Sequence, residues 1–233
     1  MRHITTIAAM TLAIGCGDNK FEYAGFQTHK YFPIDGETRH WEYYSEDTSY
    51  LIRVDMLSPK TSSGSTDIAT LEYTQVSPRK LLWTMQWSSD SADGVQVHGY
   101  MLEEGATTGS GDDTGDAGGD TGGSSINAEI GTWVSFDPPV QISKYQMAPG
   151  ESVETTTGGV TYTSTLEEQK KCPNNWVAED PWDCLVFKVE GDNGAPFVGT
   201  WEMATKWGVS RFQPASKSGT PWVLTDAGIE WED

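Results

Sequence analysis

The sequence predicts an all-β protein whose single antiparallel domain has about eleven strands. Two observations support this prediction. Apolar and polar residues alternate with a period of two in many short segments, as expected for strands with one buried face. Short polar connections separate these segments, and no long window carries the apolar stripe of an amphipathic helix. The pattern fits either a sandwich or a strongly curved sheet such as a half-barrel.

In the first half of the chain, the alternation is clearest in residues 50–57, 81–87 and 95–101. Shorter strands are expected at 39–45 and 67–76. In the segment 95–101, Val97, Gly99 and Met101 are predicted to share the buried face, because successive side chains of a strand point to opposite faces. His98 is then expected to face solvent, a position that suits a general base poorly.

The second half of the chain shows the same alternation in residues 160–166, 185–189 and 197–203. Shorter strands are expected at 131–136, 208–213 and 221–225, and residues 165–171 allow one helical turn. Four tryptophans fall on strand patterns and are expected in the core: Trp41, Trp83, Trp87 and Trp201.

An acidic, glycine-rich segment interrupts the strands at residues 105–125. It contains no large apolar residue, so nothing in it offsets the entropy lost on ordering, and we expect a flexible acidic loop. Asp112, Thr114 and Asp116 have the spacing of the first ligands in an EF-hand calcium loop. However, Ala117 occupies the position that requires glycine, which argues against a specific calcium site.

Two of the three cysteines, Cys172 and Cys184, flank a segment rich in proline and asparagine. A zinc site between them is disfavoured because such sites need four ligands at short spacings and no histidine is nearby. A structural disulfide that closes this loop is therefore predicted.

The loop between these cysteines is the predicted partner surface. It carries Trp176 and Trp182 beside Asn174 and Asn175, a combination of aromatic and amide groups that can stack on sugars or pack against a protein. The alternative is that the two tryptophans cap the end of the sheet.

The first residues have the order of a secretion signal: Arg2, an apolar run at 4–14, Gly15 and then Cys16. A cysteine at this point resembles the lipobox of bacterial lipoproteins. The resemblance implies a signal peptide at 1–15 and lipidation of Cys16. We then expect a tether at 16–30 and the β-rich domain at 31–233. The alternative is an ordinary signal peptide cut near Gly17.

Further along, the chain resembles uncharacterised bacterial envelope lipoproteins. Tyr31-Phe32-Pro33-Ile34-Asp35-Gly36 followed by Trp41-Glu42-Tyr43 looks like their "YFPL, G, W-x-Y" opening, and Gly15-Cys16-Gly17-Asp18 is similar to the junction in myxobacterial lipoproteins. The resemblance implies an outer-membrane lipoprotein of the cell envelope, periplasmic or surface-exposed. Some envelope lipoproteins of this shape resemble the lipoprotein-carrier half-barrel.

The net charge and the absence of catalytic motifs argue against several classes of function. The net charge of −19 and the lack of a basic patch argue against nucleic-acid binding. The sequence has no G-x-S-x-G, H-E-x-x-H, P-loop or G-x-G-x-x-G motif. We therefore expect no catalytic residues, metal or cofactor.

The leading hypothesis is a non-catalytic binding or structural module that is held on a membrane by N-terminal acyl chains and has an envelope protein or glycan as partner. One alternative is a lipid- or lipoprotein-handling half-barrel. A second is a carboxylate-dependent glycan hydrolase, which the many acidic residues leave open.

Overall fold

The computed structural model describes residues 25–32, 38–45, 51–63, 66–103, 128–172, 183–192, 194–205, 207–215 and 221–230. Within these ranges the protein consists of β-strands and one short 3-10 turn, η1 (Thr28–Tyr31). No helix in the described ranges is long and apolar enough to span a bilayer.

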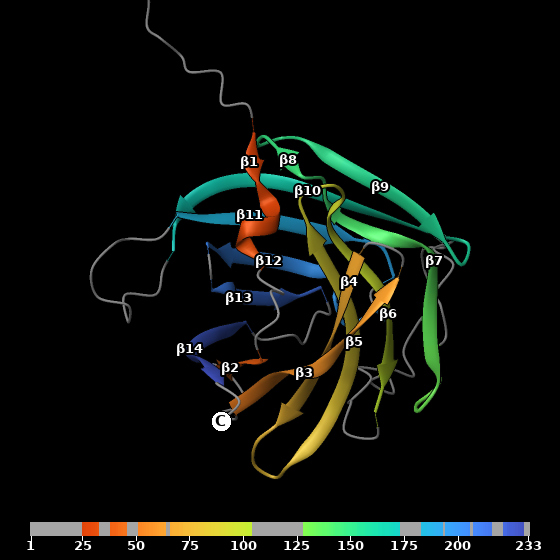
Figure 1. Cartoon of the computed structure of the whole chain (residues 1–233), viewed down its shortest axis with the longest axis vertical. Helices are drawn as coiled ribbons and strands as arrows, with labels where there is room; N and C mark the ends of the chain where they lie inside the picture. The colour runs from red at the N-terminus through yellow and green to blue at the C-terminus, as the bar shows by residue number, and fades with distance from the viewer. Residues whose placement is uncertain are drawn as a thin grey trace, which may run out of the picture.

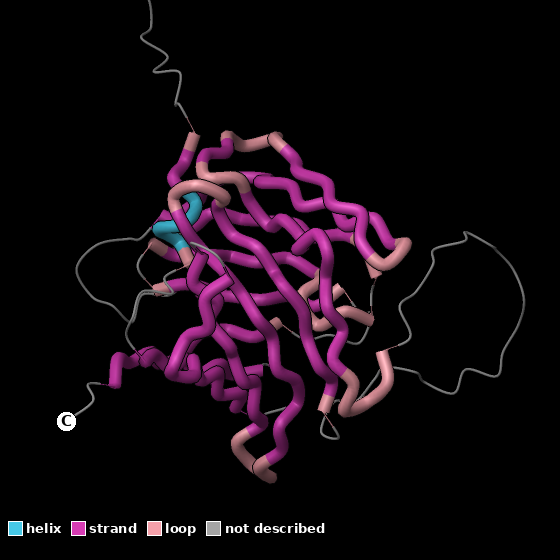
Figure 2. The backbone as a smooth tube through the Cα atoms, turned by 45° about the vertical axis from the view of Figure 1, so that its right-hand side comes forward, coloured by secondary structure: helices cyan, strands magenta, loops and turns pink. Residues whose placement is uncertain are grey.

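Twelve antiparallel strands form one sheet in the order β7-β6-β5-β4-β3-β2-β14-β13-β12-β11-β10-β9. The sheet curves into a nearly closed half-barrel (Figures 1 and 2). Its strands are β2 (Thr38–Ser45), β3 (Leu51–Ser63), β4 (Thr66–Gln75), β5 (Lys80–Asp90), β6 (Gly94–Leu102), β7 (Trp133–Ser143), β9 (Ser152–Thr157), β10 (Val160–Lys171), β11 (Asp183–Glu190), β12 (Gly199–Ala204), β13 (Gly208–Pro214) and β14 (Trp222–Glu230). The predicted all-β class is confirmed. Of the two predicted architectures, the structure has the curved sheet and not the sandwich.

The strand β9 is absent from the sequence-based prediction. Its buried positions are Val153, Thr155 and Thr157, so two of the three inward side chains are polar and the apolar alternation is lost. Gly158 and Gly159 connect it to β10, both with positive φ (58° and 80°), as a two-residue hairpin turn requires. The helical turn expected at residues 165–171 is wrong, because these residues continue β10.

The predicted buried face of β6 changes partway along the strand. The register of β6 against β7 shifts between Val97 and Gly99, and the register of β6 against β5 is shifted as well. Beyond the shift Tyr100 and Leu102 are buried, whereas Met101, which was expected on that face, is only half-buried. A β-bulge moves the following side chains to the opposite face, which explains the error.

His98, next to this irregularity, is half-buried and not fully exposed as expected. Its Nε2 atom lies 2.8 Å from Ser88 Oγ. Burial lowers the pKa of the imidazole below its ordinary value, because the charged form loses hydration.

Aromatic side chains occupy the interior of the half-barrel. One group centres on Trp201, whose ring lies 5.4 Å from Trp87 and 4.2 Å from Phe212. A second group has Phe136 5.7 Å from Tyr162 and from Phe197. The four tryptophans expected in the core are buried or half-buried. These contacts make the inside of the curved sheet a packed aromatic core.

The N-terminal segment 26–32 covers one end of this core. Strand β1 (Phe26–Gln27) pairs with β8 (Gln146–Met147) to form a second, two-stranded sheet (Figure 1). The amide of Thr28 donates to the carbonyl of Tyr145 at 3.0 Å, and the ring of Phe32 stacks on Trp87 at 4.8 Å. Part of the stretch expected to act as a tether thus packs against the domain.

Candidate functional site

The two ends of the large sheet, β7 and β9, face each other at a junction that we call the seam. In the described part of the chain, β7 forms its backbone ladder with β6 and β9 forms its ladder with β10. Between them, the amide of Asp137 donates to Thr157 Oγ1 at 3.1 Å, and the amide of Gln141 donates to Thr155 Oγ1 at 3.0 Å. Threonine hydroxyls therefore join the two edges in place of a backbone ladder.

The residues between these two donors explain why a ladder does not form. Pro138 and Pro139 have no amide hydrogen, so these two residues offer no donors to a neighbouring strand. Because Asp137 and Gln141 already donate to the threonines, β7 is protected against addition of a strand from another molecule.

A groove of about 870 Å³ follows the outer side of the seam. We call it the seam groove. Its lining residues are Ala92, Asp93, Gln96, Pro138, Pro139, Gln141, Lys144, Tyr145, Ser152, Val153, Glu154, Thr155 and Thr156. Most of the polar groups are neutral amides and hydroxyls, which both donate and accept hydrogen bonds.

Two glutamines on one wall of the seam groove are held in place by hydrogen bonds. Gln96 Nε2 donates to Gln141 Oε1 at 2.8 Å, and Gln141 Nε2 donates to the carbonyl oxygens of Asp93 and Ser143. Both side chains are half-buried. Their amide groups are thus oriented before any ligand binds, which reduces the entropy cost of recognition.

On the other wall, exposed hydroxyls pair across β9 and β10. Ser152 Oγ lies 2.8 Å from Thr165 Oγ1, and Thr156 Oγ1 lies 2.9 Å from Thr161 Oγ1. Exposed Glu154 lies between these two pairs on β9. This wall adds hydroxyl groups and a carboxylate to the amides opposite.

Replacing both seam threonines, Thr155→Val and Thr157→Val, is expected to destabilise the fold. Valine has nearly the same shape but no oxygen, so the amides of Asp137 and Gln141 lose their acceptors at a buried junction. Leaving a buried donor unpaired costs about 1–3 kcal/mol. Urea denaturation followed by circular dichroism measures the loss. Thr163→Val on the adjacent strand is the control, and equal stability of both variants would show that the hydroxyls do not hold the seam.

The predicted disulfide between Cys172 and Cys184 is present and joins the end of β10 to the start of β11, with a Cα–Cα distance of 5.0 Å. Both cysteines are buried and pack with Ala204 and half-buried Trp207 in a small second apolar cluster. Leu185 and Phe187 point into the main core, so the alternation of β11 places Cys184 on the outer face.

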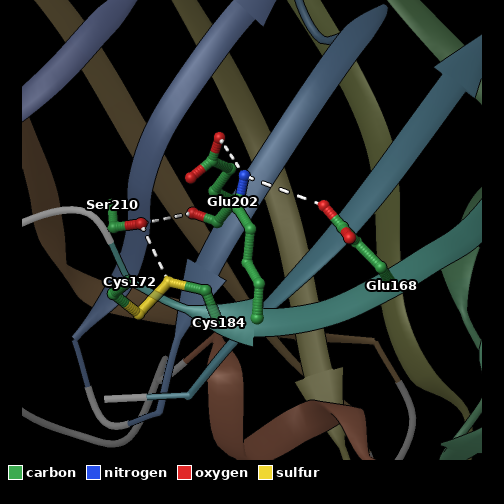
Figure 3. Close-up of a disulfide and its surroundings, with 6 residues drawn as sticks. Glu168, Cys172, Cys184, Glu202 and Ser210 are labelled. Carbon is green, nitrogen blue, oxygen red and sulfur yellow. Dashed lines mark hydrogen bonds and ion pairs between the residues drawn. A yellow bond between two sulfur atoms is a disulfide. The ribbon is translucent and has the colours of Figure 1, made fainter. Parts of the chain in front are cut away.

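Next to the disulfide lies an almost completely buried carboxylate, Glu202 on β12 (Figure 3). Its Oε1 atom accepts from Lys170 Nζ at 2.9 Å and from Arg211 Nη1 at 3.1 Å, and its backbone oxygen accepts from Ser210 Oγ at 3.0 Å. Lys170 Nζ also lies 3.9 Å from Glu168 Oε1.

This ion-pair network connects β10, β12 and β13 on the outer face. The side chain of Glu202 is 3% exposed, and its Oε1 atom is already paired with both Lys170 and Arg211. We interpret the network as a structural support for the disulfide region. Sequence reasoning missed it because Lys170, Glu202 and Arg211 come from three separate strands.

The other predicted site residues lie outside the described residues. These are Cys16 and the partner-surface residues Asn174, Asn175, Trp176 and Trp182, as well as the acidic segment 105–125. The lipidation site and the partner surface therefore stay predictions. In the described ranges, no group of three or more His, Cys, Asp or Glu residues is placed to hold a metal ion.

No protein-family model, curated protein or solved structure matches this chain. The fold and the seam groove define an antiparallel half-barrel with a packed interior and a polar groove on its outer surface. Its function has to be inferred from that geometry and from the N-terminal sequence.

Proposed function

We propose that the protein is a lipid-anchored, non-catalytic binding module of the bacterial cell envelope, attached to the outer membrane. Its ligand binds to the outer surface of the half-barrel. The observation that carries this proposal is the contrast between the two faces of the sheet. Aromatic rings in mutual contact occupy the inside, whereas the outside has a preformed groove of about 870 Å³.

The proposed anchor would keep this groove close to a membrane. Residues 17–24 separate Cys16 from Gly25, where the described part of the domain begins. A fully extended chain of this length spans roughly 30 Å. Acyl chains on Cys16 would therefore restrict the domain to partners at or near the membrane surface, such as envelope proteins and glycans.

The anchor is tested by Cys16→Ala in the full chain. Because acylation needs the thiol, the parent should enter the detergent phase with the added mass of its acyl chains, and the variant should carry no such mass. Intact mass spectrometry after detergent-phase partitioning measures both results. A variant in which Cys172 and Cys184 are both alanine is the control and should keep the acyl mass. A parent cut near Gly17 without lipid would contradict the proposal.

The ligand-binding part is tested by co-sedimentation of the purified full-length protein with isolated cell-wall sacculi and with vesicles of envelope lipids. A binding module should be retained by sacculi, and the seam-groove variants Gln96→Ala and Glu154→Ala should weaken that retention. If the lipidated protein associates with vesicles only through its acyl chains and never with another envelope component, a binding role is contradicted.

The half-barrel shape also supports the lipid-handling alternative, in which an acyl chain lies inside the curved sheet. For this to occur, the rings of Phe136, Tyr162 and Phe197 would have to separate, although they now lie 5.4–5.7 Å apart. A fluorescent fatty acid separates the two possibilities. Saturable binding that quenches the buried tryptophans would favour the lipid-handling function.

A further inference from the structure

The charge of the seam groove disfavours anionic ligands. Among the residues that line it, Lys144 carries the positive charge, and Asp93 and Glu154 carry negative charges. The chain as a whole has a net charge of −19. A phosphate-rich or otherwise polyanionic ligand would therefore approach against an unfavourable potential.

The β7 edge of the seam groove also disfavours an extended peptide. Peptides that add to a sheet gain most of their affinity from main-chain hydrogen bonds with a free edge. On β7, the amides of Asp137 and Gln141 already donate to threonine hydroxyls, and Pro138 and Pro139 have no amide hydrogen. A peptide in the groove would find few main-chain partners on this side.

The groups that remain available match a neutral sugar chain. Gln96 presents the second hydrogen of its Nε2 group, and Ser152, Glu154 and Thr156 present oxygen atoms on the opposite wall. Gln141 orients Gln96 and is not itself a donor to the ligand, because both of its Nε2 hydrogens already donate to the carbonyls of Asp93 and Ser143. The lining also has flat apolar surfaces, the two proline rings and the ring of Tyr145, which stacks on His29 at 5.2 Å. Saccharides have hydroxyls around the edge of each ring and C–H groups on its faces, so they complement such a lining.

From these observations we infer that the seam groove binds a neutral oligosaccharide. This inference rests on the proposed function, because it names the ligand class of the binding module. Side chains recognise the sugar hydroxyls from both walls, and the backbone edge of β7 takes no part. The ligand can come from the amino-sugar strands of the cell wall or from a neutral hexose polysaccharide, which have the same hydroxyl chemistry.

The experiment is isothermal titration calorimetry on the purified full-length protein. Chitotetraose serves as the amino-sugar probe and maltotetraose as the hexose probe. A threonine-rich hexapeptide and inorganic polyphosphate test the two disfavoured classes. We expect one of the saccharides to bind, and binding to weaken about tenfold in Gln96→Ala and in Glu154→Ala, since each loses one hydrogen-bonding group. Gln169→Ala, an exposed glutamine on β10 outside the groove, should bind like the parent.

Three results would overturn the inference: no heat of binding with either saccharide at millimolar concentration, tighter binding of the peptide or polyphosphate, or equal affinities in the groove variants and Gln169→Ala. Circular dichroism melts of each variant show whether a lost affinity reflects unfolding, and Glu154→Ala, at an exposed position, should keep the parental melt. Failure of saccharide binding in a protein that is lipidated at Cys16 and retained by sacculi rejects this inference alone. Absence of both lipidation and retention rejects the proposed function.

Discussion

The substitution Trp201→Ala is expected to lower the free energy of unfolding by about 3–5 kcal/mol, the usual cost of removing a fully buried tryptophan. Trp201 is 1% exposed and its ring contacts those of Trp87 and Phe212. Its Nε1 atom donates to the carbonyl of Phe197 at 2.7 Å, so the truncation leaves both a cavity and a buried acceptor without its donor. Such a loss is a large part of the stability of a typical domain.

Guanidinium denaturation followed by far-ultraviolet circular dichroism measures this effect. Trp133→Ala is the matched control, because Trp133 is only half-buried at the edge strand β7 and should cost clearly less. Trp201→Phe retains most of the packing and should fall between the parent and Trp201→Ala. If Trp201→Ala and Trp133→Ala were equally stable, the packed aromatic core would be contradicted, and an open interior able to hold an acyl chain would become the better interpretation.

Removal of the disulfide is expected to cost about 3 kcal/mol, because a cross-link between residues 12 apart restricts the unfolded chain. The double variant Cys172→Ala, Cys184→Ala should show this loss of stability relative to the oxidised parent. Cys184 is completely buried and Cys172 nearly so, so lost packing adds to the effect.

Denaturation of the parent with and without dithiothreitol gives an independent measurement of the same quantity. Reduction should destabilise the parent and leave the double variant unchanged. If reduction does not move the denaturation midpoint of the parent, the cross-link contributes no stability. The support of this region would then have to come from other contacts, such as the pairs of Glu202 with Lys170 and Arg211.

Local sequence information was sufficient for the strands with an apolar face and for the disulfide. Side chains in a strand alternate between faces, so Ile52, Val54 and Met56 identify their strand without knowledge of its neighbours. The pairing of Cys172 with Cys184 follows from the small number of cysteines and the loop-like residues between them.

Features that depend on how neighbouring strands pair could not be predicted from local sequence patterns. The bulge near Gly99 arises from the pairing of β6 with β5 and β7, so the burial of Tyr100 in place of Met101 has no local signal. Strand β9 was missed because its inward threonines have a role only where the two ends of the sheet meet.

The fold class was therefore determined by the sequence alone, whereas the candidate site was decided by the tertiary structure. The seam groove combines Gln96 of β6, Gln141 of β7 and Thr156 of β9. Gln96 and Gln141 are cross-strand partners on the adjacent strands β6 and β7. Thr156 comes next to them only because small twists between successive strands add up over a twelve-stranded sheet until its ends meet. The alternation of apolar and polar residues along one strand carries no information about the total twist of the sheet. The alternation therefore predicts which residues are buried, but it does not predict which edge strands come together.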